Sequence, residues 1–256
     1  MSMGTSSRRM DIFNLLQKNK AVEVSELARL FNVSTMTIRR DLEMLEKQGL
    51  VTKNYGGAQL NQGAAIEPSF TLKQKTQMNC KSAIAKEAAR FVQDGDSILI
   101  DCGTTTLQLC RFIQDKRITV ITNSWPAVSY LQANPKIKLI LAPGIYSSTS
   151  NGVISAMTID FFHQFQADKV FVGSQGFDLK EGATVPDMED CQVKRALIKS
   201  GRKKFLMIDH EKFNTHYLCR HAAASEFDVI ITDNQLDAAL RAEAEALKLP
   251  LILAKD

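Results

Sequence analysis

The fold is constrained most strongly by an alternation of strand-like and helix-like segments that begins at residue 97. Short runs rich in β-branched residues recur, and most of the gaps between them have helical character. The predicted strands are Ser97–Ile100, Ile118–Thr122, Ile137–Ala142, Lys169–Gly173, Lys204–Ile208, Val229–Thr232 and Leu251–Leu253. The predicted helices are Thr105–Gln114, Trp125–Ala133, Ile159–Gln166, Cys191–Ser200 and Asp237–Leu247. This alternation predicts an α/β fold with an open, mainly parallel sheet and right-handed crossovers.

A different pattern in residues 1–58 predicts a small helical domain. The broad apolar stripe of Ser7–Asn19 indicates a first helix, and the β-branched segment Ala21–Val24 indicates a short strand. We expect Ser25 to cap a second helix, which is followed by a brief turn at Asn32-Val33. The side chains of this helix expected to face the core are Leu27, Leu30 and Phe31.

The segment Ser34–Lys47 predicts a helix that reads DNA. Ser34 is a good N-cap, and an apolar face repeats at Ile38, Leu42 and Leu45. The opposite face carries Thr35, Met36, Arg39 and Arg40, and Thr37 lies in the same first turns. Arg binds guanine or phosphate in bidentate fashion, and Thr meets a phosphate or the thymine methyl. The alternative is a solvated helix face with two ordinary arginines.

The neighbours of this helix favour the DNA-reading interpretation. Two helices joined by a short turn are the helix-turn-helix arrangement, which places its second helix in the major groove. The strand-like run Leu50–Tyr55 and the turn Gly56-Gly57 predict a wing, in which Lys53, Asn54 and Tyr55 contact DNA. The alternative is a plain hairpin that closes a small core. Residues 1–57 hold 9 Lys/Arg and 6 Asp/Glu, a net +3 of the chain's +4, which favours a polyanionic partner.

Between the two patterns, Gln59–Ser69 lacks periodicity and contains Gly63 and Pro68, so it predicts an interdomain linker. The expected organisation is a DNA-binding domain at residues 1–58, a linker at 59–70 and a second domain at 71–256. The second domain is expected to start with a helical segment, Thr71–Gln93.

Small polar residues follow three of the predicted strands. Ligands of open α/β sheets bind beyond the carboxyl ends of the strands. The residues concerned are Asp101, Gly103, Thr104, Thr105 and Thr106 after the first strand, Asn123 and Ser124 after the second, and Gly144 after the third. A Gly next to hydroxyl side chains at a helix start suits a phosphate. Any one of these segments alone is equally consistent with a capped helix or a turn, but together they favour a phosphorylated or polyhydroxy ligand.

Three later segments carry further candidates. Gly173, Gly176, Asp178 and Gly182 indicate a Gly-punctuated loop after a strand. Glu189 and Lys194 lie at the start of a helix, where a solvated helix face is the alternative interpretation. The segment Asp209–Lys212 follows another strand. Carboxylates there suit sugar hydroxyls, and Lys194 or Lys212 suits a phosphate.

Several classes of protein are disfavoured. No apolar run of about 18 residues predicts a membrane span, and MSMGTSSRRMD has no signal-peptide core, so we expect a cytoplasmic protein. The five scattered cysteines suit reduced thiols, and Cys102 is expected to be a packed thiol. Nucleotide-binding and hydrolase motifs are absent, and no cofactor is predicted. His210, His216, Cys219 and His221 fit no zinc spacing, so no metal site is predicted from them.

The chain resembles the DeoR family of bacterial transcriptional regulators over nearly its whole length. The N-terminal resemblance rests on Arg9, the run SELARLFNVSTMTIRRDLEMLEKQGLV and the following YGGA. The C-terminal resemblance rests on DCGTTT, ITNS, the PG of APG, VGSQGFDLKEGAT and DHEKF. It implies an N-terminal winged helix-turn-helix domain followed by a mostly parallel α/β sensor domain. That sensor domain is expected to be similar to ribose-5-phosphate isomerase and CoA-transferase-like folds.

The resemblance also implies a function in carbohydrate metabolism. Members commonly repress operons for sugar or sugar-alcohol use and release operator DNA when a phosphorylated sugar binds. By position, the implied DNA contacts are Ser34, Thr35, Met36, Thr37, Arg39, Arg40, Lys53 and Tyr55. The implied ligand contacts are Asp101, Gly103, Thr104, Thr105, Thr106, Asn123, Ser124, Gly144, Gly176, Asp178, Glu189, Lys194 and Lys212.

We therefore expect a repressor that binds operator DNA as a homo-oligomer, a dimer or tetramer, and responds to a phosphorylated sugar or sugar alcohol. One alternative is a sugar-phosphate isomerase or deaminase with a DNA-binding appendage, in which Glu189, Asp178 and the lysines serve in acid–base catalysis. Another alternative is an activator in place of a repressor. Turnover of sugar phosphates and a reporter assay distinguish these alternatives.

Overall fold

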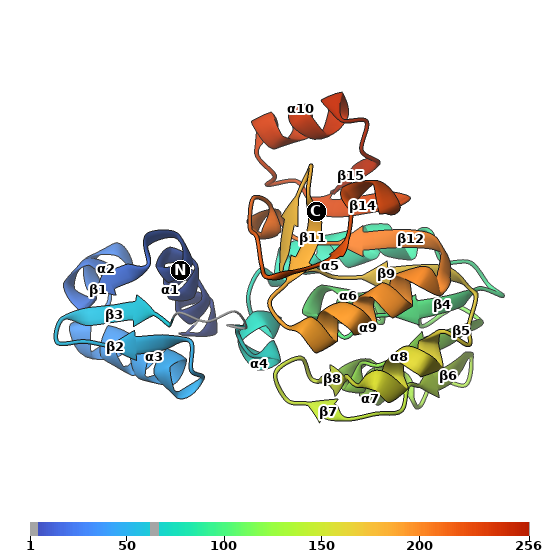
Figure 1. Cartoon of the computed structure of the whole chain (residues 1–256), viewed down its shortest axis with the longest axis horizontal. Helices are drawn as coiled ribbons and strands as arrows, with labels where there is room; N and C mark the ends of the chain where they lie inside the picture. Colours follow the sequence, from blue (N-terminus) through green and yellow to red (C-terminus); the bar gives the residue numbers. More distant parts are fainter. Residues whose placement is uncertain (1–4, 62–66, 256) are drawn as a thin grey trace. The chain divides into compact units, whose positions relative to one another are not determined.

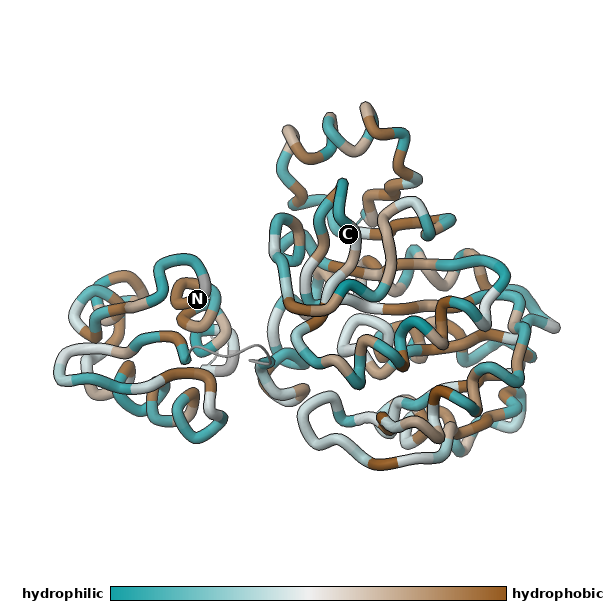
Figure 2. The backbone as a smooth tube through the Cα atoms, in the orientation of Figure 1, coloured by the Kyte–Doolittle hydropathy of each residue, from teal (hydrophilic) through white to brown (hydrophobic). Residues whose placement is uncertain are grey.

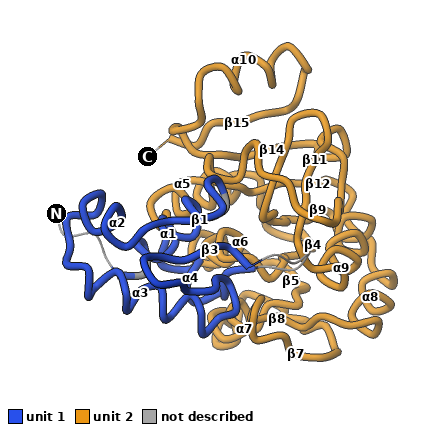
Figure 3. Tube along the Cα trace, turned by 60° about the vertical axis from the view of Figure 1, so that its left-hand side comes forward, with its two compact units in different colours: residues 1–76 blue, residues 77–256 orange. Residues whose placement is uncertain are grey.

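A computed structural model describes residues 5–61 and 67–255 of the 256-residue chain. The chain divides into two compact units, residues 1–76 and 77–256, which Figure 3 colours separately. The predicted boundaries were 58 and 71. Gly63 of the predicted linker lies outside the described residues.

The first unit combines helices with a small antiparallel sheet, which is the winged helix-turn-helix arrangement (Figure 1). Its helices are α1 Thr5–Asn19, α2 Val24–Leu30, α3 Thr35–Lys47 and α4 Phe70–Gln74. Its strands are β1 Ala21–Glu23, β2 Val51–Lys53 and β3 Gly57–Leu60, in the order β1-β3-β2. The predicted inward face of α3 is confirmed, because Ile38, Leu42 and Leu45 are buried in the core of this unit.

Two predictions about α2 were wrong. The helix begins at Val24, so Ser25 lies inside it and Glu23 stands at the N-cap without a side-chain cap hydrogen bond. The Val24 N–H donates to Gly56 O across the sheet, which satisfies a group that a cap would otherwise serve. Leu30 is 64% exposed, because it lies about 200° around the helix from the buried Ala28.

The predicted linker and the helix after it also need correction. Gln59 and Leu60 belong to β3, which pairs with both β1 and β2. The predicted helix Thr71–Gln93 is two helices, α4 and α5 Met78–Ala89, because Gln77 between them has a φ of 50°, outside the helical region. Leu72 of α4 packs in the core of the first unit.

The second unit is built on a seven-stranded parallel sheet, and every predicted strand contributes to it (Figure 1). The sheet order is β15-β14-β12-β9-β4-β5-β6. The strands are β4 Ser97–Ile100, β5 Ile118–Thr122, β6 Ile137–Leu141, β9 Ala167–Val172, β12 Gly201–Met207, β14 Val229–Asp233 and β15 Leu251–Ala254. Figure 2 shows hydrophobic residues concentrated along the central strands, which agrees with burial on both faces of a parallel sheet.

Helices connect these strands at nearly the predicted places. They are α5, α6 Thr104–Leu109, α7 Trp125–Leu131, α8 Ala156–Phe162, α9 Met188–Lys199 and α10 Ala238–Ala246, with 3₁₀ turns η1 His210–Lys212 and η2 Ala224–Glu226. Helix α8 begins three residues before the predicted Ile159, because the Ser155 hydroxyl accepts a hydrogen bond from Thr158 N and caps it there. No helix of the described chain is long and apolar enough to cross a membrane.

The predicted Gly-punctuated loop is largely strand. Its residues form β10 Gly176–Asp178 and β11 Gly182–Val185, which pair with β13 Cys219–Ala222 in an antiparallel sheet. Both glycines permit close approach of backbones, since a Cβ on Gly176 would lie 2.2 Å from Thr215 O and one on Gly182 would lie 2.2 Å from Ala222 O. A second small pair, β7 Tyr146–Ser147 and β8 Gly152–Val153, follows β6.

A buried ionic cluster joins α1 to α3 in the first unit. Arg8 Nε lies 2.6 Å from Asp41 Oδ2, and Arg9 Nε lies 2.8 Å from Asp41 Oδ1. Asp41 is 1% exposed, so its charge depends on these two arginines for compensation. The pairing fixes the helix that carries Arg39 and Arg40 against the first helix.

We expect Asp41→Ala to lower the free energy of unfolding of the N-terminal unit by about 3 kcal/mol, because it leaves the buried Arg8 unpaired. The measurement is urea unfolding of the full chain followed by circular dichroism. Glu43→Ala, an exposed change on the same helix, is the control and should alter stability by no more than about 0.5 kcal/mol. Equal effects of the two substitutions would contradict the proposed importance of the cluster.

Candidate functional site

The outward face of α3 presents the predicted DNA-reading residues. Thr35, Met36, Arg39 and Arg40 are exposed, and Met36 is 55% exposed. Ser34 caps the helix as predicted, with its hydroxyl 3.2 Å from Thr37 N. The Thr37 hydroxyl lies 2.9 Å from Ser34 Oγ, so these two side chains shape the start of the helix. The arginines are consequently held on a short, well-capped helix.

The wing lies in the β2–β3 hairpin beside this helix. Asn54 Oδ1 accepts hydrogen bonds from Gly56 N and Gly57 N and forms its turn, and Tyr55 is fully exposed at the tip. Lys53 Nζ lies 3.2 Å from Glu46 Oε2 and 3.8 Å from Glu43 Oε1. Lys53 therefore links the wing to α3, and its charge is shared with two glutamates.

In the second unit, a buried ion pair lies at the carboxyl edge of the sheet. Asp101 follows β4, Lys194 lies on α9, and Lys194 Nζ is 2.5 Å from Asp101 Oδ2. Gly173 N, after β9, donates to the same oxygen at 3.1 Å. Asp190 Oδ2 lies 3.9 Å from Lys194 Nζ, and all three ionisable side chains are buried. The predicted alternative of a solvated helix face does not describe Lys194.

The charge of Lys194 is stabilised by its neighbours. Burial alone would lower its pKa, but the carboxylates of Asp101 and Asp190 outweigh burial and raise the pKa above its usual value. Lys194 is therefore a permanent buried cation. A Lys ammonium of this kind is a compact charge suited to a phosphate or carboxylate.

Among the buried side-chain atoms without a hydrogen-bond partner in the described residues are three acceptors that follow strands of this sheet. They are Asp101 Oδ1 after β4, Asn123 Oδ1 after β5 and Asp209 Oδ1 after β12. An unsatisfied buried polar group costs about 1–3 kcal/mol. Since all three atoms are acceptors, ligand hydroxyl groups are suitable partners for them.

The predicted threonine loop is arranged around the start of α6. Gly103 is the N-cap, and its N–H donates to Thr106 Oγ1 at 3.0 Å, while the Thr106 hydroxyl is 2.8 Å from Asp101 O. Thr104 and Thr105 occupy the first turn and are buried. The Thr106 hydroxyl is thus used to close the loop. Thr104 and Thr105, three and four residues after Asp101, supply the other two hydroxyl groups of the loop.

The residues after β5 and β6 have structural contacts of their own. Asn123 Nδ2 donates to Val153 O at 3.1 Å, and Ser124 Oγ caps α7 by accepting from Ala127 N. Gly144 has a φ of 143°, and a Cβ there would lie 2.3 Å from Ser155 Oγ. Gly144 is therefore required by the backbone of this loop.

Other predicted ligand residues have local contacts or positions of their own. Asp178 Oδ1 accepts from Lys180 N and Glu181 N and so closes the β10–β11 turn. Glu189 is exposed in the first turn of α9, and its neighbour Asp190 is the carboxylate beside Lys194. Gly176 begins β10, and Lys212 is half-buried in η1.

Asp190, Ser174 and His221 were missed from the sequence. Asp190 precedes Lys194 by four residues. This spacing puts both side chains on one face of a helix, so it predicts the ion pair once the helix α9 is known to include both residues. His221 lies on β13, a strand that was not predicted, and the sequence suggested it only as a metal-ligand candidate. Both Asp190 and His221 are buried, and Lys194 contributes to the pKa shift of His221.

The tautomer of His221 follows from its contacts. His221 Nε2 lies 3.1 Å from Ser174 Oγ, and the Ser174 hydroxyl donates toward Gly176 O and Thr184 O. Nε2 therefore carries the proton, and Nδ1 is an acceptor without a partner among the described residues. Burial, and then Lys194 and Arg195, hold the His221 pKa well below its usual value, so the ring is neutral.

The four residues considered as metal ligands have different partners. His210 Nδ1 lies 2.9 Å from Asp233 Oδ1, and His216 Nε2 lies 3.8 Å from Asp178 Oδ2. His221 contacts Ser174, and Cys219 is half-buried on β13. The predicted packing of Cys102 is confirmed, since it is 5% exposed.

Comparison with known proteins assigns both units to one family. A DeoR-like helix-turn-helix domain matches residues 8–64, and a DeoR C terminal sensor domain matches residues 76–234. The chain belongs to the DeoR family. It is a DNA-binding transcriptional regulator and not an enzyme.

Similar DeoR-family proteins match over nearly the whole chain. The HTH-type transcriptional regulator GolR of Listeria innocua is 33% identical over 97% of this chain and 98% of its own. The glycerol-3-phosphate regulon repressor of Escherichia coli is 31% identical over 90% of this chain and 92% of its own. Among solved structures, ribose 5-phosphate isomerase A of Methanocaldococcus jannaschii is 16% identical, with a TM-score of 0.39 over 54% of this chain and 55% of its own.

The depressed pKa of His221 predicts a pH dependence of stability. Below pH 6.5 the unfolded chain binds a proton at this residue that the folded chain does not, so stability is lost as pH falls. From pH 7.5 to 5.5 the loss from this residue is about 1.4 kcal/mol. We expect His221→Gln to lose less stability than wild type over this range by about that amount, measured by urea unfolding. A wild-type pH dependence in His221→Gln would show that the His221 ring is not buried and neutral.

Proposed function

We propose that this DeoR-family regulator represses an operon for sugar or sugar-alcohol use and that a phosphorylated sugar or sugar alcohol releases it from operator DNA. The DNA is read by α3 and the wing. The effector binds at the carboxyl edge of the parallel sheet. The regulator acts in the cytoplasm as a homo-oligomer, a dimer or tetramer, because paired helix-turn-helix domains read operator half-sites together.

The observation that carries the effector proposal is the buried cation Lys194 beside buried acceptor atoms that have no partner. Lys194 supplies the positive charge that a phosphate needs, with Asp101 and Asp190 holding it in place. Asp101 Oδ1, Asn123 Oδ1 and Asp209 Oδ1 supply acceptors for several hydroxyl groups. A ligand with both an anionic group and hydroxyls uses both features, and a phosphorylated polyol is such a ligand.

A relative supports the same class of ligand. The Escherichia coli protein that is 31% identical to this chain is named as the repressor of a glycerol-3-phosphate regulon. Glycerol 3-phosphate is a phosphorylated sugar alcohol. We infer a ligand of this chemical class for the present chain, with its own size and stereochemistry.

The proposed contacts follow the two sites. The DNA contacts are Ser34, Thr35, Met36, Thr37, Arg39, Arg40, Lys53 and Tyr55. The effector contacts are led by Asp101, Thr104, Thr105, Asn123, Lys194 and His221. Effector binding needs to change operator affinity by 5–150-fold, which is a coupling free energy of about 1–3 kcal/mol between the two sites.

The DNA half of this proposal is tested with Arg39→Ala and Arg40→Ala. Each substitution should weaken binding by roughly 5–150-fold, because an arginine contact to a base is worth about 1–3 kcal/mol. The probe is DNA selected from a random-sequence pool by the wild-type chain, and the readout is a mobility shift at fixed salt. Arg90→Ala, an exposed arginine of the second unit, is the control and should bind as wild type. Wild-type affinity in both α3 variants would reject α3 as the reading helix.

The effector half is tested by thermal unfolding with phosphorylated sugars and polyols, their unphosphorylated forms and inorganic phosphate. A ligand at 100 times its Kd stabilises the folded state by about 2.7 kcal/mol, so we expect one phosphorylated compound to raise the Tm by roughly 5–10 °C. The same compound should release the selected DNA. Asp101→Asn should weaken its binding at least ~10-fold, because a hydrogen bond to a charged group is worth about 1.5–3 kcal/mol.

Asp160→Asn, an exposed carboxylate on α8, is the matched control and should respond as wild type. If Asp101→Asn binds the effector with unchanged affinity, the effector does not bind at the carboxyl edge of the sheet. If the unphosphorylated compounds raise the Tm equally, the phosphate group is not recognised and this part of the proposal is wrong.

A further inference from the structure

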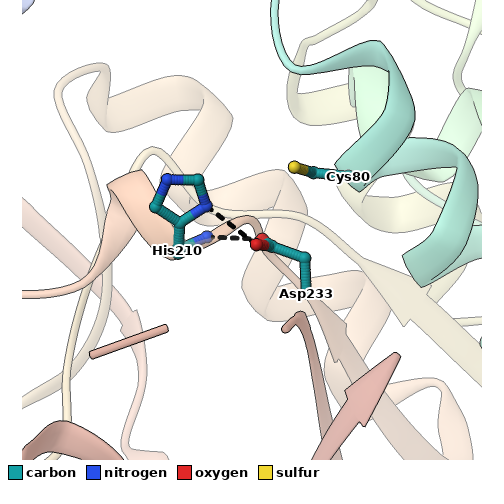
Figure 4. A group of neighbouring side chains, drawn as sticks. All are labelled: Cys80, His210 and Asp233. Atoms are coloured by element: carbon teal, nitrogen blue, oxygen red, sulfur yellow. Dashed lines mark hydrogen bonds and ion pairs between the residues drawn. The ribbon is translucent and has the colours of Figure 1, made fainter. Parts of the chain in front are cut away.

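Cys80, His210 and Asp233 are brought together from three separate elements of the second unit (Figure 4). Cys80 lies at the start of α5, His210 begins η1, and Asp233 is the last residue of β14. One ligand atom from each residue lies within 4.8 Å of the other two. Thiol, imidazole and carboxylate are the three side-chain groups that zinc prefers in proteins.

The distances approach those of a tetrahedral zinc site. Zinc bonds of about 2.0–2.3 Å place neighbouring ligand atoms roughly 3.3–3.6 Å apart. The separation of His210 Nδ1 and Asp233 Oδ1 is 2.9 Å, and one metal-binding atom from each of the three residues lies within 4.8 Å of the other two. Coordination by all three residues therefore requires the His210–Asp233 pair to open by a few tenths of an ångström.

Neighbouring groups hold the ligands in orientation. Asp233 Oδ2 accepts from His210 N at 2.8 Å, and Asp233 Oδ1 accepts from Gln235 N at 3.1 Å. Gln235 Nε2 lies 3.1 Å from Cys80 Sγ, and a donor directed at sulfur favours the thiolate that binds metal. Hydrogen bonds of this kind orient ligands and tune metal affinity in known sites.

The cluster is also accessible from one side. Cys80 and Asp233 are buried, but the His210 side chain is 22% exposed, so solvent reaches the cluster from the His210 side. Three protein ligands with one open position are the arrangement of an exchangeable zinc site. Soft thiolate and imidazole ligands select zinc-class ions over magnesium or calcium.

We propose that Cys80, His210 and Asp233 form a binding site for a zinc-class divalent cation. The site lies at the same sheet edge as the Asp101–Lys194 pair but three strands away, which is roughly 14 Å. The proposal does not rest on the proposed effector function, although Asp209, one of the acceptors proposed for the effector, directly precedes His210. On binding, the Cys80 thiol releases its proton to solvent, and His210 releases to solvent the Nδ1 proton that it donates to Asp233 Oδ1. The bound ring is then neutral with its proton on Nε2, and Cys80 Sγ and His210 Nδ1 both face the metal.

The test uses the full chain without a polyhistidine tag, freed of metal by a chelator and titrated with cobalt(II) and then zinc(II). We expect one cobalt(II) per chain with a thiolate-to-cobalt charge-transfer band, which stoichiometric zinc(II) removes. Cys80→Ser should lose that band and weaken zinc binding at least ~10-fold, and His210→Gln should weaken zinc binding by a similar factor.

Cys219→Ser, which changes a half-buried thiol outside the cluster, is the control and should keep the band. Thermal unfolding of each metal-free variant reports whether it is folded. Cys80→Ser replaces only the sulfur by oxygen, so we expect it to fold and to test the site even if His210→Gln does not fold. Absence of stoichiometric binding by the wild type, or a band that survives Cys80→Ser, would overturn the proposal.

Discussion

A parallel sheet places the carboxyl ends of all its strands at one edge, and the arrangement of the second unit depends on this constraint. Seven strands run the same way in the order β15-β14-β12-β9-β4-β5-β6, so the residues that follow them meet although they are far apart in the sequence. Asp101 and Gly173 are 72 residues apart and share a hydrogen bond. The edge therefore collects both the proposed effector contacts and the proposed metal ligands.

The same edge contains a buried ionic cluster, Lys194 with Asp101 and Asp190, which the folded state does not need for its stability. Replacing a buried ion pair by apolar residues is often neutral or stabilising. Lys194 is nonetheless buried between Asp101 and Asp190, with acceptor atoms of Asp101, Asn123 and Asp209 lacking partners among the described residues. Such an arrangement is explained when a ligand supplies the missing donors, which is why we place the effector there.

In the first unit, a few polar contacts between elements position α3 and the wing. Its core is small, and Asp41 ties α1 to α3 through Arg8 and Arg9. The Ser34 cap fixes where α3 begins, and Lys53 links the wing to Glu46. These contacts hold the backbone of α3, which carries the exposed Arg39 and Arg40, in a defined position.

The sequence by itself determined the elements whose signals are local. Apolar periodicity and a Ser cap defined α3, and β-branched runs defined all seven strands of the parallel sheet. Only the tertiary structure decided which polar side chains meet. The carboxylate beside Lys194 is that of Asp190 and not that of the predicted Glu189. His221 lies on β13, which was not predicted. The proposed metal ligands Cys80, His210 and Asp233 come from three different elements. The physical reason is that helical and strand periodicity act over a few residues, whereas contacts at a sheet edge depend on strand order and register, which no short stretch of sequence encodes.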